Sequence, residues 1–165
     1  VSLDRAAQVH VSTMWGQVNV DRIGGGGHIT GTGEVRIQEI AGNATVKNLN
    51  GDSWIGEVTG DISLNAANGN IIVERPGGDV IARTAHGSIQ VGRLIRGKAE
   101  LKTAFGQLDI GIAKGVAAWL DVKSSGGIVH NSMTPGDAPQ AGDGGTVEVR
   151  GRTAAGNIHI HHATV

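Results

Sequence analysis

Histidines are the side chains of this chain best suited to chemistry, and three of its seven cluster near the C-terminal end: His159, His161 and His162. Isoleucine alternates with histidine in this segment, and alternate side chains of a β-strand point to opposite faces. We therefore expect His159 and His161 on one outer face, where two imidazoles could share a metal ion. The simpler interpretation is an exposed polar face on the last strand. We favour the simpler one, and the sequence leads us to expect no cofactor.

Outward apolar side chains are the second kind of candidate, because they could stack on a ligand. Trp54 and Ile72 occupy equivalent outward positions in neighbouring sequence units. Trp54 could stack on a sugar or a partner surface, or it could pack beneath a neighbouring side chain. Trp119 is expected to anchor a long loop at residues 131–144. These three residues are the candidate binding residues that the sequence offers.

Acidic residues do not form a catalytic or calcium-binding pattern. Asp52, Asp61 and Asp79 each follow a glycine, where an aspartate typically accepts hydrogen bonds from the backbone of a turn. The glycine- and aspartate-rich nonapeptide of calcium-binding β-rolls has one near match, at residues 75–79. The outward column that contains Trp54 lacks the clusters of Asp, or of Arg and Lys, of solenoid enzymes that act on glycans. The sequence therefore predicts no catalytic residue.

Composition argues against several classes of partner. The 165 residues carry a formal net charge of -1, which argues against nucleic acid or an anionic membrane surface. There is no cysteine, so there is no disulfide framework and no thiolate zinc site. No apolar stretch approaches the roughly 18 residues of a membrane span. The cytoplasm is favoured over export. The chain starts within its repeat pattern, so we expect a fragment of a longer array.

Glycine recurs along the chain at a fixed period, and this repeat defines the elements that position the candidates. One series has members 17 to 20 residues apart: Gly16, Gly33, Gly51, Gly69, Gly87, Gly106 and Gly126. A second series interleaves with it: Gly24, Gly42, Gly60, Gly78, Gly97 and Gly115. Gly156 and Gly145 extend the two series beyond a gap. The second and fourth residues after each glycine are mostly apolar, and this alternation is typical of a short strand with one buried face.

The repeat predicts an all-β fold, a single-stranded parallel β-solenoid. Each period of about 18 residues holds two short strands about nine residues apart, which leaves no room for a helical crossover. The handedness preference of parallel strands predicts a right-handed β-helix in which each coil stacks on the last. We expect eight or nine coils in one domain over residues 1–165, with residues 131–144 as a loop insertion. His130 stands where other units place an inward aliphatic residue, and it is expected to mark the end of a strand before this loop.

Several segments resemble the actinobacterial branch of a bacterial adhesin-like family, a domain of unknown function built of β-strand repeats. The resemblance lies in residues 46–61, 103–106 and 115–121, and in the closing segment 146–153. It covers roughly residues 30–165. It implies a β-solenoid whose biochemical role is not established, and it carries no catalytic residues.

The sequence therefore favours a non-enzymatic, structural or adhesin-like interaction module that binds a protein, a glycan or a component of the cell envelope. The alternative is a self-assembling scaffold, a homo-oligomer formed through the open ends, because the exposed edges of a sheet recruit further strands. Bactofilin-like proteins stack short solenoids in this way. The histidines of the last strand suit capping better than polymerisation. An enzyme that acts on a glycan is the least favoured of the three.

Overall fold

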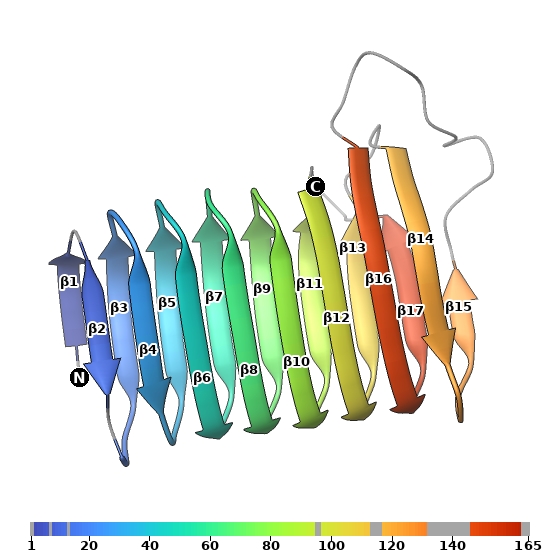
Figure 1. Cartoon of the computed structure of the whole chain (residues 1–165), viewed down its shortest axis with the longest axis horizontal. Helices are drawn as coiled ribbons and strands as arrows, with labels where there is room; N and C mark the ends of the chain where they lie inside the picture. Colours follow the sequence, from blue (N-terminus) through green and yellow to red (C-terminus); the bar gives the residue numbers. More distant parts are fainter. Residues whose placement is uncertain are drawn as a thin grey trace.

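The computed structural model describes residues 2–6, 8–12, 14–94, 97–112, 117–131 and 146–162. All regular secondary structure in these residues is β-strand, and every strand pairing is parallel. Two sheets face each other, and the chain alternates between them as it advances (Figure 1). Odd-numbered strands run up the far sheet and even-numbered strands run down the near one, so the coils from β1 to β13 are right-handed, as predicted. No helix in the described residues is long and apolar enough to cross a bilayer.

The two sheets hold nine and eight strands, and they are called sheet A and sheet B. Sheet A consists of β1 (Ser2–Ala6), β3 (Val18–Ile23), β5 (Val35–Ile40), β7 (Ser53–Val58), β9 (Ile71–Pro76), β11 (Ile89–Leu94), β13 (Leu108–Ile112), β15 (Val129–Asn131) and β17 (Ile158–His162). Sheet B consists of β2 (Val9–Ser12), β4 (Gly27–Gly31), β6 (Ala44–Asn50), β8 (Ile62–Asn68), β10 (Val80–His86), β12 (Gly97–Phe105), β14 (Ala117–Ser124) and β16 (Thr146–Ala155).

The core consists of aliphatic columns that run along the solenoid between the sheets. Because neighbouring strands pair in register about 18 residues apart, equivalent inward positions of successive coils stack directly. One such column in sheet A is fully buried: Ile37, Ile55, Val73, Val91, Ile110 and Ile160. The alternation of apolar and polar residues read from the sequence therefore separates core from surface.

Tight corners explain the first glycine series. Gly51 has a φ of 124°, and Gly69 has a φ of 135°, a region that side chains other than glycine rarely adopt. A Cβ atom at Gly69 would also collide with the backbone carbonyl of Gly51 in the preceding coil. Glycine at these corners is thus required both by backbone conformation and by the close approach of stacked coils.

In five coils a polar residue three positions before the corner glycine ties the coil to a neighbour. The Thr103 hydroxyl donates to the carbonyl oxygen of Gly87 at 3.0 Å, one coil back. Equivalent bonds to a corner glycine carbonyl come from Asn48 (2.8 Å), Thr84 (3.4 Å), Ser124 (2.7 Å) and Thr153 (3.1 Å). The recurrence of Thr, Asn and Ser at this position follows from that bond, since the side chains are buried or half-buried and need a partner.

The last coils do not stack in chain order, contrary to the expectation that each coil stacks on the last. In sheet B, β16 lies between β12 and β14, and in sheet A β17 lies between β13 and β15. The coil made of β16 and β17 is therefore inserted between two coils that precede it in the sequence (Figure 1). The predicted loop at 131–144 begins within β15, which ends at Asn131, and its remaining residues lie outside the described part of the chain.

Register in these coils also differs from the alignment of the glycine series. Gly127, rather than Gly126, is the stacked corner residue, because its Cβ would meet the carbonyl of Gly156. In sheet B, Val147 stands opposite Gly97, and Ala118 stands opposite Val147. The assignments of Gly145 and Gly115 to the second series were therefore wrong by two and three residues. Loop insertions shift the spacing that the periodic alignment relied on.

Candidate functional site

A row of cationic side chains crosses the outer face of sheet B. Arg83 on β10 stands opposite Lys102 on β12, Lys102 opposite Arg152 on β16, and Arg152 opposite Lys123 on β14. All four side chains are exposed. All four point outward because each is an odd number of residues from the inward positions of its own strand. We call Arg83, Lys102, Arg152 and Lys123 the basic row.

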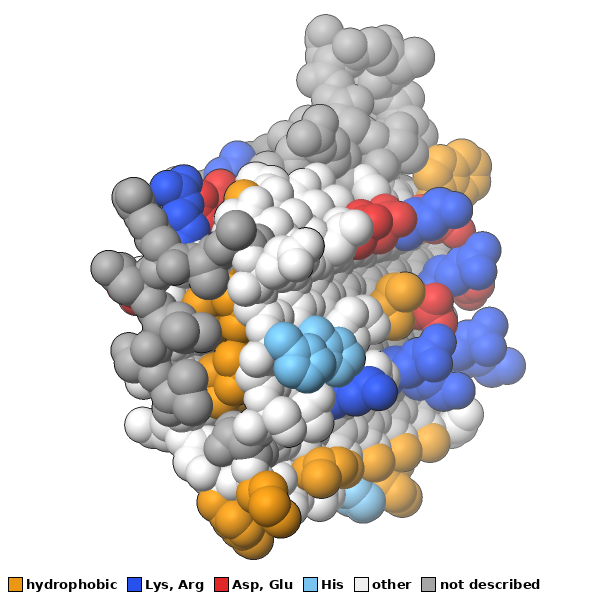
Figure 2. Space-filling model, turned by 60° about the vertical axis from the view of Figure 1, so that its left-hand side comes forward, with side chains coloured by type: hydrophobic (Ala, Val, Ile, Leu, Met, Phe, Trp, Pro, Cys, Tyr) orange, Lys and Arg blue, Asp and Glu red, His pale blue; other side chains and the backbone are white. Residues whose placement is uncertain are grey.

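A groove of about 570 Å³ follows the basic row along the solenoid. Three members of the row line it, Arg83, Lys102 and Arg152, together with Asn65 on β8. Its other side is formed by small residues close to the corner: Ala66, Ala85, Ala104, Ala154 and Ser125. Figure 2 shows Lys and Arg side chains gathered in one part of this face, next to a line of hydrophobic side chains. From β8 to β16 the groove spans about 15 Å, since parallel strands lie about 4.8 Å apart.

Charge in the basic row is only partly balanced. Arg83 pairs with Glu100 at 3.4 Å, but the described residues contain no ion pair for Lys102, Arg152 or Lys123. Like charges directly opposite on neighbouring strands repel one another. A net charge of -1 for the whole chain thus coexists with a strongly positive strip. An anionic ligand in the groove would relieve the repulsion within it.

An aromatic pair stands beside the groove at the corner. His86 and Phe105 lie opposite each other on β10 and β12, and their rings stack with centroids 5.1 Å apart. The Phe105 side chain is 56% exposed. The pair offers a flat apolar surface beside the alanines, which suits a ligand with one apolar face.

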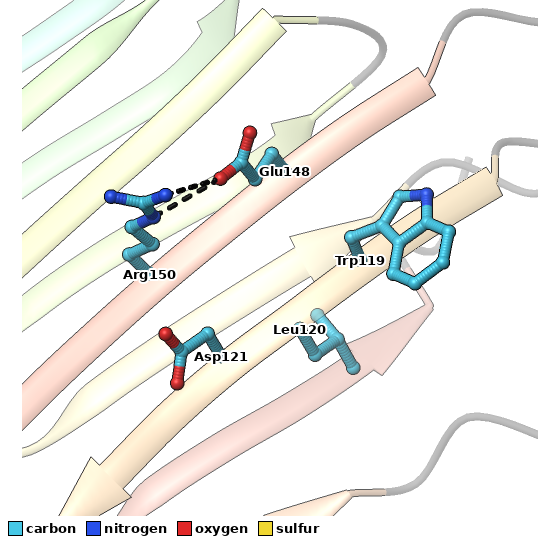
Figure 3. Close-up of a pocket in the computed structure, with 5 residues that line it drawn as sticks. All are labelled: Trp119, Leu120, Asp121, Glu148 and Arg150. Atoms are coloured by element: carbon cyan, nitrogen blue, oxygen red, sulfur yellow. Dashed lines mark hydrogen bonds and ion pairs between the residues drawn. The ribbon is translucent and has the colours of Figure 1, made fainter.

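Trp119 lies on the outer face of the edge strand β14 and is 66% exposed. It lines a second hollow of about 430 Å³ with Leu120, Asp121, Glu148 and Arg150. Figure 3 shows Trp119 on β14 and the Glu148–Arg150 pair, 3.0 Å apart, on β16. The loop that Trp119 was expected to anchor lies largely outside the described residues, so that expectation stays a prediction.

Trp54 and Ile72 lie on the opposite side of the molecule from the basic groove. They stand opposite each other on β7 and β9, on the outer face of sheet A, and both are half-buried. Arg36 on β5 flanks Trp54 on its other side. The structure therefore brings the two candidates together but keeps them apart from Trp119, which belongs to sheet B.

His159 and His161 lie together on the outer face of β17, as predicted, with ring centroids 5.2 Å apart. Asp109 on β13 faces them, and its Oδ1 atom lies 2.6 Å from Nε2 of His161. His130 on β15 stands opposite His159. The prediction that His130 takes an inward aliphatic position was wrong, because the register of β15 places Val129 there and turns His130 outward. His130 does lie next to the end of β15, as expected.

The basic row was missed by sequence reasoning, although a signal for it exists. Arg83 and Lys102 each follow a second-series glycine by five residues, as Lys47 does. The outward column examined for charge clusters belonged to the first series, which forms sheet A. Arg152 and Lys123 were not aligned with them, because the registers of β16 and β14 are shifted by two and three residues from the alignment on Gly145 and Gly115.

Comparison with known proteins adds no relative to this description. No protein-family model, curated protein or solved structure matches the chain.

Proposed function

We propose that this chain is a non-enzymatic, adhesin-like interaction module that binds a linear acidic glycan along the basic groove. One observation carries the proposal: Arg83, Lys102 and Arg152 follow one another in register along a groove, and the last two have no ion-pair partner among the described residues. A ligand with repeated negative charges would meet one cation about every 4.8 Å.

A sugar chain fits the groove better than a nucleic acid does. Acidic sugars combine carboxylates at their edges with apolar ring faces, and the groove has cations on one side and alanines on the other. Single-stranded nucleic acid is typically held by several aromatic side chains that stack on successive bases. The described lining of the groove holds no aromatic residue, and Phe105 stands beside it. The net charge of -1 also differs from the basic balance of nucleic-acid-binding domains.

Titration with oligogalacturonate, with neutral dextran as a second ligand, tests the proposal. We expect saturable binding of the acidic oligomer that weakens as salt is added, and none of dextran. The double variant Lys102→Glu/Arg152→Glu should lower the affinity at least about tenfold. A matched control, Arg22→Glu/Arg36→Glu, changes the net charge equally on the outer face of sheet A and should bind normally. Oligo-dT serves as a nucleic-acid competitor in the same titration. An equal loss of affinity for oligogalacturonate in both double variants, or tighter binding of oligo-dT than of oligogalacturonate, contradicts the proposal.

Self-assembly through the last coil is the second candidate function. β14 and β15 are edge strands, and no described strand pairs with their outer edges. Val129 on β15 and Ile128 beside it are exposed at this end. An open apolar edge recruits further strands, and an inward-pointing lysine blocks such pairing. We therefore expect concentration-dependent association in sedimentation velocity that Val129→Lys abolishes. Monomer alone at high concentration would exclude this candidate.

A further inference from the structure

A cluster of ligating side chains lies on the outer face of sheet A, where the inserted strand β17 runs beside β13. Asp109 on β13 stands opposite His159 on β17, and His161 follows two residues later on the same face. Asp109 and His161 are half-buried, whereas His159 is exposed. This cluster lies on the other sheet from the basic groove and is independent of the proposed glycan binding.

Its geometry brings three ligand atoms of suitable kinds together. Asp109, His159 and His161 each contribute one ligand atom, and these three atoms lie within 4.8 Å of one another. Nε2 of His161 and Oδ1 of Asp109 are 2.6 Å apart. The two imidazole rings are tilted by 45° rather than stacked flat, with centroids 5.2 Å apart. Small side-chain rotations would bring all three atoms to a common point about 2.0–2.2 Å from each.

We propose that Asp109, His159 and His161 form a binding site for a divalent transition metal ion, with zinc as its occupant. Two imidazole nitrogens and one carboxylate are a donor set that zinc accepts in a tetrahedral arrangement with one position left for water or a ligand. Calcium and magnesium prefer oxygen donors, so the two imidazoles disfavour them. The His130 ring, whose centroid lies 5.2 Å from that of His159, is the nearest further imidazole on β15.

The competing interpretation is a simple ion pair between His161 and Asp109, with His159 in ring contact with its histidine neighbours. A second histidine pair in the molecule serves as an internal comparison. His10 and His28, on β2 and β4, also have ring centroids 5.2 Å apart, but their rings are nearly parallel. They belong to no group of three ligating residues among the described residues. Two neighbouring imidazoles alone should therefore not hold zinc, whereas the cluster with Asp109 should.

A metal ion in this site would fasten the inserted coil. Asp109 and His161 are 52 residues apart in the sequence and lie on adjacent strands. An ion bound by both would cross-link β17 to β13, and it would stabilise the folded chain because the unfolded chain keeps its ligands apart. Metal binding thus predicts a change in stability as well as a binding signal.

Calorimetric titration of tag-free protein with zinc chloride tests the proposal, with cobalt(II) absorption as a second measurement. We expect one saturable site and a cobalt spectrum typical of tetrahedral coordination. Asp109→Asn and His161→Asn should each lower the affinity at least about tenfold. His28→Asn is the matched control and should bind like the parent chain.

Thermal unfolding separates a lost ligand from a lost fold. Zinc at a hundredfold excess over its dissociation constant should raise the melting temperature by roughly 5–10 °C. Asp109→Asn should melt close to the metal-free parent and lose most of the zinc-dependent rise. The proposal is overturned if zinc shows no saturable binding, if Asp109→Asn binds like the parent, or if His28→Asn weakens binding as much as His161→Asn does.

Discussion

The coils from β3 to β12 and those from β13 to β17 follow different stacking rules. In the first region the strands of each sheet follow one another in space in the order of the chain. In the second region β16 and β17 lie between strands that precede them in the sequence. The candidate sites lie where this difference occurs. Lys102 meets Arg152 across β12 and β16, and Asp109 meets His159 across β13 and β17. The inserted coil therefore extends the basic row that Arg83 and Lys102 begin, and it forms the metal cluster.

Regular stacking leaves little freedom for specialised side chains on the inside or at the corners. Corner glycines, the threonine column and the aliphatic columns recur because each coil must match its neighbours. Insertion of a later coil places residues about 50 positions apart in the chain side by side on the surface. The departure from order, rather than the repeat itself, is what assembles a site from distant segments.

The largest expected effect concerns the order of the strands, and it is all or none. Glu100, Arg150 and Asp121 form one outward column over β12, β16 and β14. The chain has no native cysteine, so introduced pairs can be followed cleanly. Glu100→Cys/Arg150→Cys should form a disulfide under mild oxidation, because adjacent strands are close enough for one. Non-reducing gel electrophoresis of the oxidised protein, followed by mass spectrometry, would measure it.

A second cysteine pair provides the control for strand order. Glu100→Cys/Asp121→Cys spans two strand spacings, about 9.6 Å, which is beyond the reach of a disulfide. This pair should remain reduced. If the Glu100→Cys/Asp121→Cys pair cross-links efficiently and the Glu100→Cys/Arg150→Cys pair does not, the coils stack in chain order. Both proposed sites would then lose their basis.

Corner glycines should show the next largest effect and should separate the two regions. Gly69→Ala forces a side chain into a positive φ and against the Gly51 carbonyl, so we expect a loss of about 4 kcal/mol in the free energy of unfolding. Gly126→Ala should cost less than about 1 kcal/mol, since its Cβ would lie 3.1 Å from the nearest backbone oxygen, a contact that a small shift relieves. Urea denaturation measures both. Equal losses would restore Gly126 as a corner residue.

Core truncation gives a smaller contrast between the same regions. Leu101 on β12 is 1% exposed, and Leu101→Ala should cost about 3 kcal/mol because it leaves a cavity between stacked coils. Leu120 on the edge strand β14 is half-buried, and Leu120→Ala should cost about 1 kcal/mol. Denaturation midpoints compare the two variants directly. A larger loss at Leu120 would mean that the end of the solenoid is covered.

The regular part of the fold was predictable because its physical causes are periodic. Alternating apolar residues define strands, and glycines at a constant spacing define corners such as Gly51 and Gly69 that stack on one another. No periodic signal reports the order of the last coils. Insertion of β16 and β17 depends on long-range pairing, and a two-residue or three-residue shift in spacing moved the predicted register at Gly145 and Gly115.

The candidate sites were predictable only within single strands. Alternation alone placed His159 and His161 on one face, and it also placed Trp54 outward. Asp109 joins the histidines through a pairing between segments about 50 residues apart, and Lys102 meets Arg152 in the same way. Such neighbours follow from the topology, which the spacing of the last glycines obscured.

The smallest expected effect isolates the charge of the basic row. Lys102 lies between Arg83 and Arg152, so Lys102→Gln removes repulsion on both sides and should slightly raise the free energy of unfolding at low salt. The gain should vanish near 1 M salt, where charges more than about 3 Å apart are screened. Lys98→Gln is the matched control on the same strand: Lys98 pairs with Glu148 at 3.8 Å, so its loss should not stabilise. Stabilisation by Lys98→Gln but not by Lys102→Gln would show that the row is neutralised in solution, and the groove would then lack the unbalanced charge on which glycan binding depends.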